Sequence, residues 1–372
     1  MIYQILFLLI ILNGYYNYSS RPSRNSPSSR KGFIIFVCVI LVLQSALRNI
    51  AVGSDTYQYF NRFQITMASS WSEIMSAFVD VYKYGEGKDP GYPLIEKIFQ
   101  IILPNYRCWL FAVAIFFFSS LGKFIYRYTS TIEDVLIAFS VYFLLFYSFF
   151  SITGLRQTIA VALSLHCFMA LRNKKYIVFV LLGIVAFTIH KSAVIIFFFP
   201  ILNKINNLKF IFVICTFLMI VFAVNRQYFI SWASESGGYE GGYSIRLPYT
   251  LMAFYVIITI WIHASVKDRS NNDTYKRLFF FYLPTYCWIP LMGWDSLFMR
   301  ESLFFSVYSM VLLPMSINGV NKNNSTVRAV FVLFSFAYFL IRCSNYGLLW
   351  DNILLPDTYG QFVIIPFEQQ IQ

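Results

Sequence analysis

The sequence predicts an all-α, polytopic integral membrane protein with about 11–12 transmembrane helices. Hydrophobic residues make up 58% of the 372 positions, charged residues make up only 12%, and the mean hydropathy is +0.61. A soluble chain of this length needs more charge than this to cover its surface. The 20% share of aromatic residues suits helices that face lipid and are anchored at its interface.

The individual helices follow from apolar runs of roughly 17–25 residues, the length that crosses the hydrocarbon core of a bilayer. In chain order, these candidate spans cover residues 2–18, 32–47, 108–126, 133–151, 155–171, 176–202, 209–225, 247–266, 278–294, 301–318 and 327–342.

The stretch 176–202 is too long for one span and carries His190, Lys191 and Ser192 in its middle. We expect two short helices that meet at this triplet as a hairpin. Basic residues in alternate loops mark the cytoplasmic side, and splitting the stretch in two keeps this alternation consistent. The basic loops lie at 21–31, 172–175, 204–209 and 267–277. The first helix then starts outside, because its basic residues follow it rather than precede it.

The whole chain, residues 1–372, is predicted to form a single transmembrane domain with three segments on the outer side. Residues 48–107 form a long polar loop with two weakly amphipathic pieces, near 70–81 and 93–103. Residues 226–246 form a flexible loop marked by a Gly-Gly-Tyr repeat. Residues 343–372 form a C-terminal tail.

Two other classes of function gain no support from the composition. The net charge of +12 would suit nucleic acid in a soluble protein, but basic cytoplasmic loops account for much of it here. The six cysteines form no Cys-x-x-Cys pair and lie mostly inside apolar runs, so we predict neither a disulfide framework nor a metal site.

The candidate functional residues are charged groups at the outer ends of apolar segments, where charge is costly and is usually kept for a ligand or a reaction. Arg48 and Asp55 leave the second helix in one run. Arg48 is either a helix-end arginine that reaches the interface or a binding residue. Asp55 is either the N-cap of a helix that starts at Thr56 or a carboxylate of the site.

Arg156 and Gln157 stand at the predicted outer end of the fifth helix. A cation at a helix N-terminus opposes the helix dipole, so it is placed there at some cost. Its guanidinium is suited to bind phosphate or carboxylate oxygens with two parallel hydrogen bonds. The alternative is an ordinary interface anchor.

Further candidates share the same predicted side. His190 is able to carry a proton near neutral pH, and the predicted hairpin interrupts an apolar run to present it. Arg300 follows the turn between two late spans. Candidate substrate contacts are Gln157 beside Arg156, Glu96 on the long loop, Lys191 beside the histidine and Arg246 after the Gly-Tyr repeat.

These residues occur in an ordered set of motifs. Val52-Gly53-Ser54-Asp55-Thr56 comes first, followed by Gly154-Leu155-Arg156-Gln157 and then by Thr188-Ile189-His190-Lys191-Ser192-Ala193. Arg300 and an apolar helix that ends at Pro314 complete the pattern. From Arg48 to Pro356 the chain resembles the EpsG-like polysaccharide polymerases, relatives of the Wzy polymerases of O-antigen and capsule.

The resemblance implies a multi-pass enzyme of the bacterial inner membrane. Such an enzyme joins oligosaccharide repeat units carried on undecaprenyl pyrophosphate, on the outer face, into O-antigen, capsule or exopolysaccharide chains. It needs no cofactor, metal or nucleotide sugar, because the lipid pyrophosphate is the leaving group. Its partners are the lipid-linked oligosaccharide and the bilayer, with a chain-length regulator protein as a further candidate and no nucleic acid.

That reaction suggests roles for the candidate residues. Arg156 and Arg300, with Arg48 as a third, would bind the pyrophosphate, and either Asp55 or His190 would be the base. The sequence leaves the choice of base open. A flippase for the same lipid-linked unit, a glycan ligase and an acyltransferase are alternative functions. Clustering of the distinctive charges on one side favours chemistry over transport, and no internal repeat supports a transporter.

Overall fold

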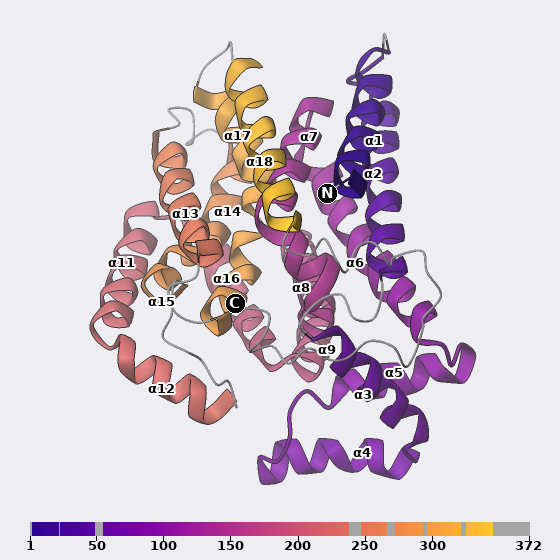
Figure 1. Cartoon of the computed structure of the whole chain (residues 1–372). Coiled ribbons are helices and arrows are strands. Elements are labelled where there is room, and N and C mark those ends of the chain that lie inside the picture. Colours follow the sequence, from indigo (N-terminus) through magenta and orange to yellow (C-terminus); the bar gives the residue numbers. More distant parts are fainter. Residues whose placement is uncertain are drawn as a thin grey trace.

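The computed structural model describes residues 2–21, 23–48, 55–237, 247–265, 272–292, 296–320 and 325–344. In these residues the fold is all-helical, as the sequence predicts. The first helices are α1 (Ile2–Ser19), α2 (Pro27–Leu47) and α6 (Tyr106–Tyr128), with α3 (Thr56–Ala68), α4 (Trp71–Val79) and α5 (Gly91–Ile102) between the last two. Figure 1 shows α4 and α5 crosswise to the long helices, at one end of the molecule.

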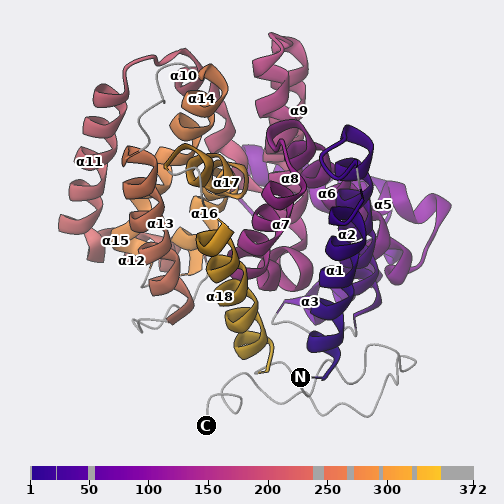
Figure 2. The ribbon, with the colours of Figure 1, turned by 90° about the horizontal axis from the view of Figure 1, so that it is seen from above.

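The central helices pack side by side around a core rich in aromatic side chains. α7 (Ile132–Val141), α8 (Leu155–Arg172) and α9 (Tyr176–Ile189) follow α6 in the chain, and α6 packs along α2 and α8, while α8 packs along α9. Fully buried rings fill the centre, among them Phe117, Phe118 and Phe124 from α6 and Phe139 from α7. Figure 2, a view from above, shows α7, α8 and α9 between α1–α2 on one side and α13–α17 on the other.

The second half of the chain adds shorter helices. They are α10 (Phe199–Lys204), α11 (Leu208–Val224), α12 (Arg226–Gly237), α13 (Leu247–Ser265), α14 (Asp273–Tyr282), α15 (Ile289–Met292), α16 (Ser296–Ser306), α17 (Ser309–Val320) and α18 (Ser325–Ser344). The helices α17 and α18 both pack against α7.

The predicted break within 176–202 is present. The helix α9 ends at Ile189, His190 has extended backbone angles (φ −153°, ψ 114°), and a 3₁₀ helix, Lys191–Phe198, leads into α10. His190 therefore lies at the turn of a helical hairpin. Its extended backbone belongs to neither helix and sets the position of the ring.

Three predicted spans are interrupted, which corrects the sequence interpretation. The stretch 133–151 is helical as α7 and then becomes π-helical over Tyr142–Phe146 and Ser148–Thr153. The stretch 278–294 divides into α14, a 3₁₀ helix (Leu283–Trp288) and α15, because prolines near these junctions lack the N–H that continues a helix. The stretch 301–318 divides into α16 and α17 at residues 307–308.

The predicted outer segments also contain more helix than expected. The long segment 48–107 holds α3, α4 and α5 and a π-helical turn, Asp80–Tyr84, although only two amphipathic pieces were expected. The interpretation of 226–246 as a loop is corrected for its first half, which forms α12, while residues 238–246 lie outside the described residues. The tail beyond Ser344 also lies outside them.

Two of the described helices, α2 and α6, are long and apolar enough to cross a membrane by length and composition. Other apolar helices, including α9 and α11, are shorter. Several of these helices carry outward-facing rows of exposed aliphatic side chains, such as Ile177, Leu181 and Ile184 on α9. Rows of this kind are rare on water-facing surfaces.

Candidate active site

Asp89 is the residue around which the candidate site is built. Its Oδ2 atom lies 2.5 Å from Nη1 of Arg156 and 3.5 Å from Nδ1 of His190. Its Oδ1 atom accepts a hydrogen bond of 2.9 Å from the backbone N–H of Lys191. Only 4% of the surface of Asp89 is exposed, so these three partners take the place of water around the carboxylate.

A close approach between α5 and α9 brings Asp89 to the histidine. Gly91, the first residue of α5, lies so close to Thr188 that a Cβ atom at position 91 would be 2.8 Å from the backbone carbonyl carbon of Thr188. Glycine is therefore required for this contact. Asp89 itself has a positive φ of 56°, a backbone conformation that aspartate tolerates better than most residues.

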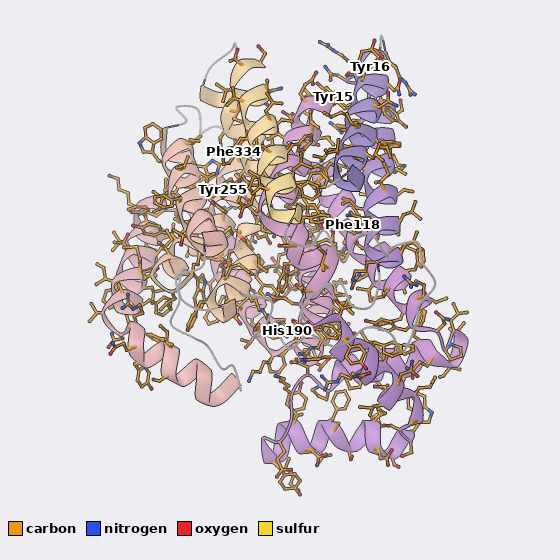
Figure 3. All side chains as sticks on the ribbon, in the orientation of Figure 1. Tyr15, Tyr16, Phe118, His190, Tyr255 and Phe334 are labelled. Atoms are coloured by element: carbon orange, nitrogen blue, oxygen red, sulfur yellow. The ribbon has the colours of Figure 1, made fainter. Side chains whose placement is uncertain are left out.

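His190 sits at the end of the molecule that carries α3, α4 and α5, opposite Tyr15 and Tyr16 (Figure 3). Its Nδ1 atom faces the Asp89 carboxylate at ion-pair distance, and both ring nitrogens are buried without a hydrogen-bond partner among the described residues. A carboxylate on one ring nitrogen fixes the orientation of the imidazole and favours a proton on that nitrogen. The other nitrogen is then able to accept a proton from a substrate.

Arg156 enters the site from the start of α8, directly after the π-helical stretch Ser148–Thr153. π-Helical turns inside helices are frequent at functional sites because they change the direction in which side chains project. Gly154 makes this turn tight, since a Cβ atom there would clash with the ring of Phe149. The guanidinium of Arg156 also lies over the ring of Tyr59, 5.8 Å from its centroid.

Arg300 and Asp55 form a second pair of opposite charges. Nη2 of Arg300 lies 3.6 Å from Oδ2 of Asp55, and Nε2 of Gln157 donates a hydrogen bond of 2.5 Å to the Arg300 carbonyl. Because Gln157 follows Arg156 on α8, it connects the second pair to the first. Asp55 stands at the N-cap position of α3, but its side chain makes no capping hydrogen bond. The geometry therefore favours the pairing role over the capping role.

Positive charge is concentrated around Asp89. Burial lowers the pKa of Lys88, and the charges of Arg156, Lys191 and Arg62 lower it further, while Asp89 opposes them. Burial alone would raise the pKa of Asp89, but His190, Arg156 and the Lys191 N–H together outweigh it and hold that pKa below its ordinary value. Asp89 is therefore ionised at neutral pH, among several cations. This excess of positive charge suits a multiply charged anion.

The residue after Arg300 belongs to the same neighbourhood. The hydroxyl of Ser192, two residues after His190, donates a hydrogen bond to Oε1 of Glu301. This contact ties α16 to the hairpin and therefore Arg300 to His190. Lys191 is close enough for its charge to act on Glu301 as well.

Two predicted site residues lie elsewhere. Arg48 is buried, donates from Nη1 to the Ser45 carbonyl, and has no described contact with Asp89, Arg156 or Arg300. Glu96 has none of its surface exposed and accepts a 3.4 Å hydrogen bond from Thr66. Glu96 is therefore buried among protein side chains, and its contact with substrate stays a prediction. Burial, only partly offset by Tyr92, Arg62 and Thr66, raises the pKa of Glu96 to about 8.

Of the other predicted substrate contacts, Lys191 joins the site through its backbone N–H, and Arg246 lies outside the described residues. The sequence interpretation missed Asp89 and Lys88 as members of the site. The available signal was an acidic residue directly before Pro90-Gly91, a turn in an otherwise polar segment. In the described part of the chain, no three His, Cys, Asp or Glu side chains are grouped in a way that would hold a metal ion.

Comparison with known proteins identifies a family. The model of the EpsG family matches residues 31–355, which is most of the chain and includes every residue of the candidate site. Neither the search of curated proteins nor the search of solved structures gave a match.

Proposed function

The chain belongs to the EpsG family, a family of Wzy-like polymerases, and from that membership we propose that it joins lipid-linked oligosaccharide repeat units into a polysaccharide. We propose further that the units are carried on undecaprenyl pyrophosphate and are joined on the outer face of the cytoplasmic membrane. One observation carries the proposal: Asp89 contacts an arginine suited to a pyrophosphate and a histidine suited to be a base, Arg156 and His190.

The proposed reaction is a direct glycosyl transfer. A hydroxyl oxygen of the acceptor sugar attacks the anomeric carbon of the donor, and the bond from that carbon to the pyrophosphate oxygen breaks. The acceptor proton passes to Nε2 of His190, and the electron pair of the broken bond stays on the lipid pyrophosphate. Direct attack of this kind inverts the configuration at the anomeric carbon.

The arginines have the electrostatic role in this proposal. Negative charge develops on the pyrophosphate as the bond breaks, and fixed cations stabilise it without having to rearrange. Asp89 contacts one nitrogen of the Arg156 guanidinium, so other N–H groups are available for phosphate oxygens. Arg300, linked to α8 through Gln157, is the second proposed cation. Arg48 is not assigned to the pyrophosphate, because its described contacts are with a different part of the fold.

His190 is the better supported of the two candidate bases. Asp55 lies 3.6 Å from Arg300, so its carboxylate already has a cationic partner. Burial, with Arg156 and Arg300 nearby, lowers the pKa of His190 despite the Asp89 carboxylate, so the ring is neutral at neutral pH and is able to accept a proton. Asp89 is then a positioning residue that orients both His190 and Arg156.

The proposed multi-pass topology is supported by contacts among the basic loops. Nη1 of Arg30 donates a 2.7 Å hydrogen bond to the Thr129 carbonyl, and Arg172 lies 2.6 Å from Asp273. Arg277 donates to the carbonyl of Asn203. Loops distant in sequence but alike in positive charge therefore meet, as they would on the cytoplasmic side. The exposed aliphatic rows of α9, α11 and α18 would face lipid.

The test is a set of substitutions in the strain that carries this gene. Arg156→Ala and His190→Ala should leave single repeat units on the final acceptor and no long chains, seen as a loss of the ladder on a gel of surface polysaccharide. Arg127→Ala is a matched control, because Arg127 bonds to Asn173 on another side of the fold. Protein levels in the membrane fraction must match the parent.

Other outcomes would point to the alternative functions. Long polymer at normal protein levels in Arg156→Ala and His190→Ala would refute the site assignment. Accumulation of lipid-linked units on the cytoplasmic face would indicate a flippase instead. Normal free polymer that is not attached to its final acceptor would indicate a ligase.

A further inference from the structure

The helix α5 has its polar and apolar faces reversed relative to a helix on a water-soluble protein. Glu96 and Gln100 point inward, with exposures of 0% and 8%. Ile98, Ile101 and Ile102 point outward, with exposures of 49%, 69% and 75%.

The reversal is fixed by contacts between α5 and α3. The side-chain amide of Gln100 donates a 2.8 Å hydrogen bond to the Phe63 carbonyl, and Thr66 donates to Glu96. Nζ of Lys97 reaches the Met67 carbonyl at 3.0 Å. These bonds hold polar side chains of α5 toward the protein, so rotation of α5 toward the opposite orientation would break them.

Exposed apolar side chains continue beyond the isoleucines of α5. Leu103 directly after α5 and Ile65 on α3 are also exposed, at the side where Lys97 bonds to the end of α3. Together, Ile65, Ile98, Ile101, Ile102 and Leu103 form a surface that we call the isoleucine edge.

Three features favour lipid as the occupant of this surface. The start of α5 packs on the end of α9, and α9 carries exposed aliphatic residues on its own outward face, so α5 branches from a helix that is proposed to face lipid. Lys97 adds positive charge beside Ile98, as basic residues do where helices meet phospholipid headgroups. The crosswise orientation of α5 relative to α6 fits a helix that lies in the membrane plane (Figure 1).

We infer that α5 is an in-plane membrane helix whose isoleucine edge enters the acyl chains of the outer leaflet. The inference rests on the proposed membrane orientation but not on glycosyl transfer. It has a consequence for the site. Gly91 packs on Thr188, two residues before His190, so α5 holds Asp89, His190 and Arg156 close to the level of the lipid phosphates. A pyrophosphate on a lipid carrier would reach them without leaving the membrane surface.

The experiment uses the full-length protein in nanodiscs that contain a phospholipid with a photoreactive diazirine in its acyl chain. After irradiation, trypsin cleaves beyond Lys97 and Arg107 and releases the peptide Ile98–Arg107, which carries most of the isoleucine edge. The peptide Tyr176–Lys191 reports on the aliphatic row of α9, and Tyr84–Lys88 reports on an exposed polar loop. Mass spectrometry measures the fraction of each peptide that carries a lipid adduct.

We expect adducts on Ile98–Arg107 at a level within about threefold of Tyr176–Lys191, and at least tenfold above Tyr84–Lys88. Replacing both Ile101 and Ile102 with Gln should lower the yield on Ile98–Arg107 and leave that on Tyr176–Lys191 unchanged. Labelling of Tyr176–Lys191 without labelling of Ile98–Arg107 would overturn the inference. A protein–protein cross-linker would then identify the true cover as a second copy, residues 345–372 or another protein.

The Arg156→Ala protein separates this inference from the proposed function. Its isoleucine edge is intact, so it should show the same adduct pattern as the parent even when it forms no polymer. If Arg156→Ala retains full polymerisation while the adducts are present, the site assignment fails and the in-plane helix stands. If Arg156→Ala loses polymer and the adducts are absent from both proteins, the in-plane helix fails and the site assignment stands.

Discussion

Asp89 and Arg156 are 67 residues apart in the sequence, yet the Asp89 Oδ2 atom and the Arg156 Nη1 atom are 2.5 Å apart in the structure. The same carboxylate oxygen faces His190. Burial of a charge is costly unless it is paired, and Asp89 is paired on both oxygens. One carboxylate thus sets the relative position of the residues proposed to act on the leaving group and on the acceptor.

Asp89→Asn should abolish most of the activity while the fold survives. Asparagine tolerates the positive φ at this position and fills the same volume, but its amide cannot stabilise a protonated His190 or pair with Arg156. We expect polymerisation to fall by about 100-fold or more, the range of general-base catalysis. The measurement is the rate of chain growth on purified protein, with the thermal unfolding midpoint as the control for folding.

A contrary result for Asp89→Asn would be informative. Activity within about threefold of the parent would mean that neither His190 nor Arg156 needs this carboxylate, which would remove the main argument for the site. Asp80→Asn is a suitable control because Asp80 lies on the same outer segment, in the π-helical turn after α4.

Gly91→Ala should disturb the site through packing. The added methyl group would meet the Thr188 side chain and lie 2.8 Å from its carbonyl carbon, so α5 and α9 would have to separate. Overpacking of this kind typically costs about 1–3 kcal/mol. We expect a lower unfolding midpoint together with loss of polymer, because Asp89 moves with α5.

Gly183→Ala is the matched control for Gly91→Ala. Gly183 lies on α9, and the nearest neighbours of a Cβ atom there would be side chains, the Phe197 ring at 3.3 Å and Ile196 at 3.9 Å, which are able to shift. Its effect on both measurements should be smaller. Equal effects of the two substitutions would mean that the α5–α9 contact has no special importance for the site.

Much of the helical pattern was predictable from the sequence because it depends on local hydropathy. The break at His190 followed from length and charge alternation, since 176–202 is too long for one span. The π-helical stretch from Tyr142 to Thr153 was not predictable in this way. Its residues are as apolar as those of a regular helix, and the change depends on packing, for example on the 2.7 Å hydrogen bond between Tyr142 and Ser151.

The site was predictable in part for a similar reason. Arg156, His190 and Arg300 stand out because each interrupts an apolar segment, where charge is unexpected. Asp89 is an acidic residue in a polar segment, so its charge alone does not distinguish it from Asp80 or Glu86, and only the Pro90-Gly91 turn that follows it does. Its burial comes from the approach of α5 to α9, a tertiary contact that hydropathy does not encode. For the same reason, Glu96 was expected on a surface and is buried.

Glu96 should make the stability of the protein depend on pH. Its pKa is raised from 4.5 to about 8 in the folded protein, so the stability it contributes is fully present below about pH 4.5 and is lost as the pH rises to about 8. Glu96→Gln mimics the neutral acid and does not titrate. The midpoint of Glu96→Gln minus that of the parent should therefore increase from pH 5 to about pH 8 and then level off. A pH-independent difference between the two midpoints would contradict this prediction.

The choice between the two candidate bases is tested by comparing His190→Gln with Asp55→Asn. If His190 accepts the acceptor proton, His190→Gln should lower the rate by about 10²–10⁴-fold. Asp55 would then act only on Arg300, and loss of a partly exposed pair of this kind is worth about 0.2–1 kcal/mol, or at most about fivefold in rate. The pH profile adds a readout that a change in folding would not produce. In Asp55→Asn the acidic limb of the profile should keep its position, because the titrating base is intact, whereas residual activity in His190→Gln should lack that limb. If Asp55→Asn loses the limb and His190→Gln keeps it, Asp55 is the base and Asp89 serves mainly to hold Arg156.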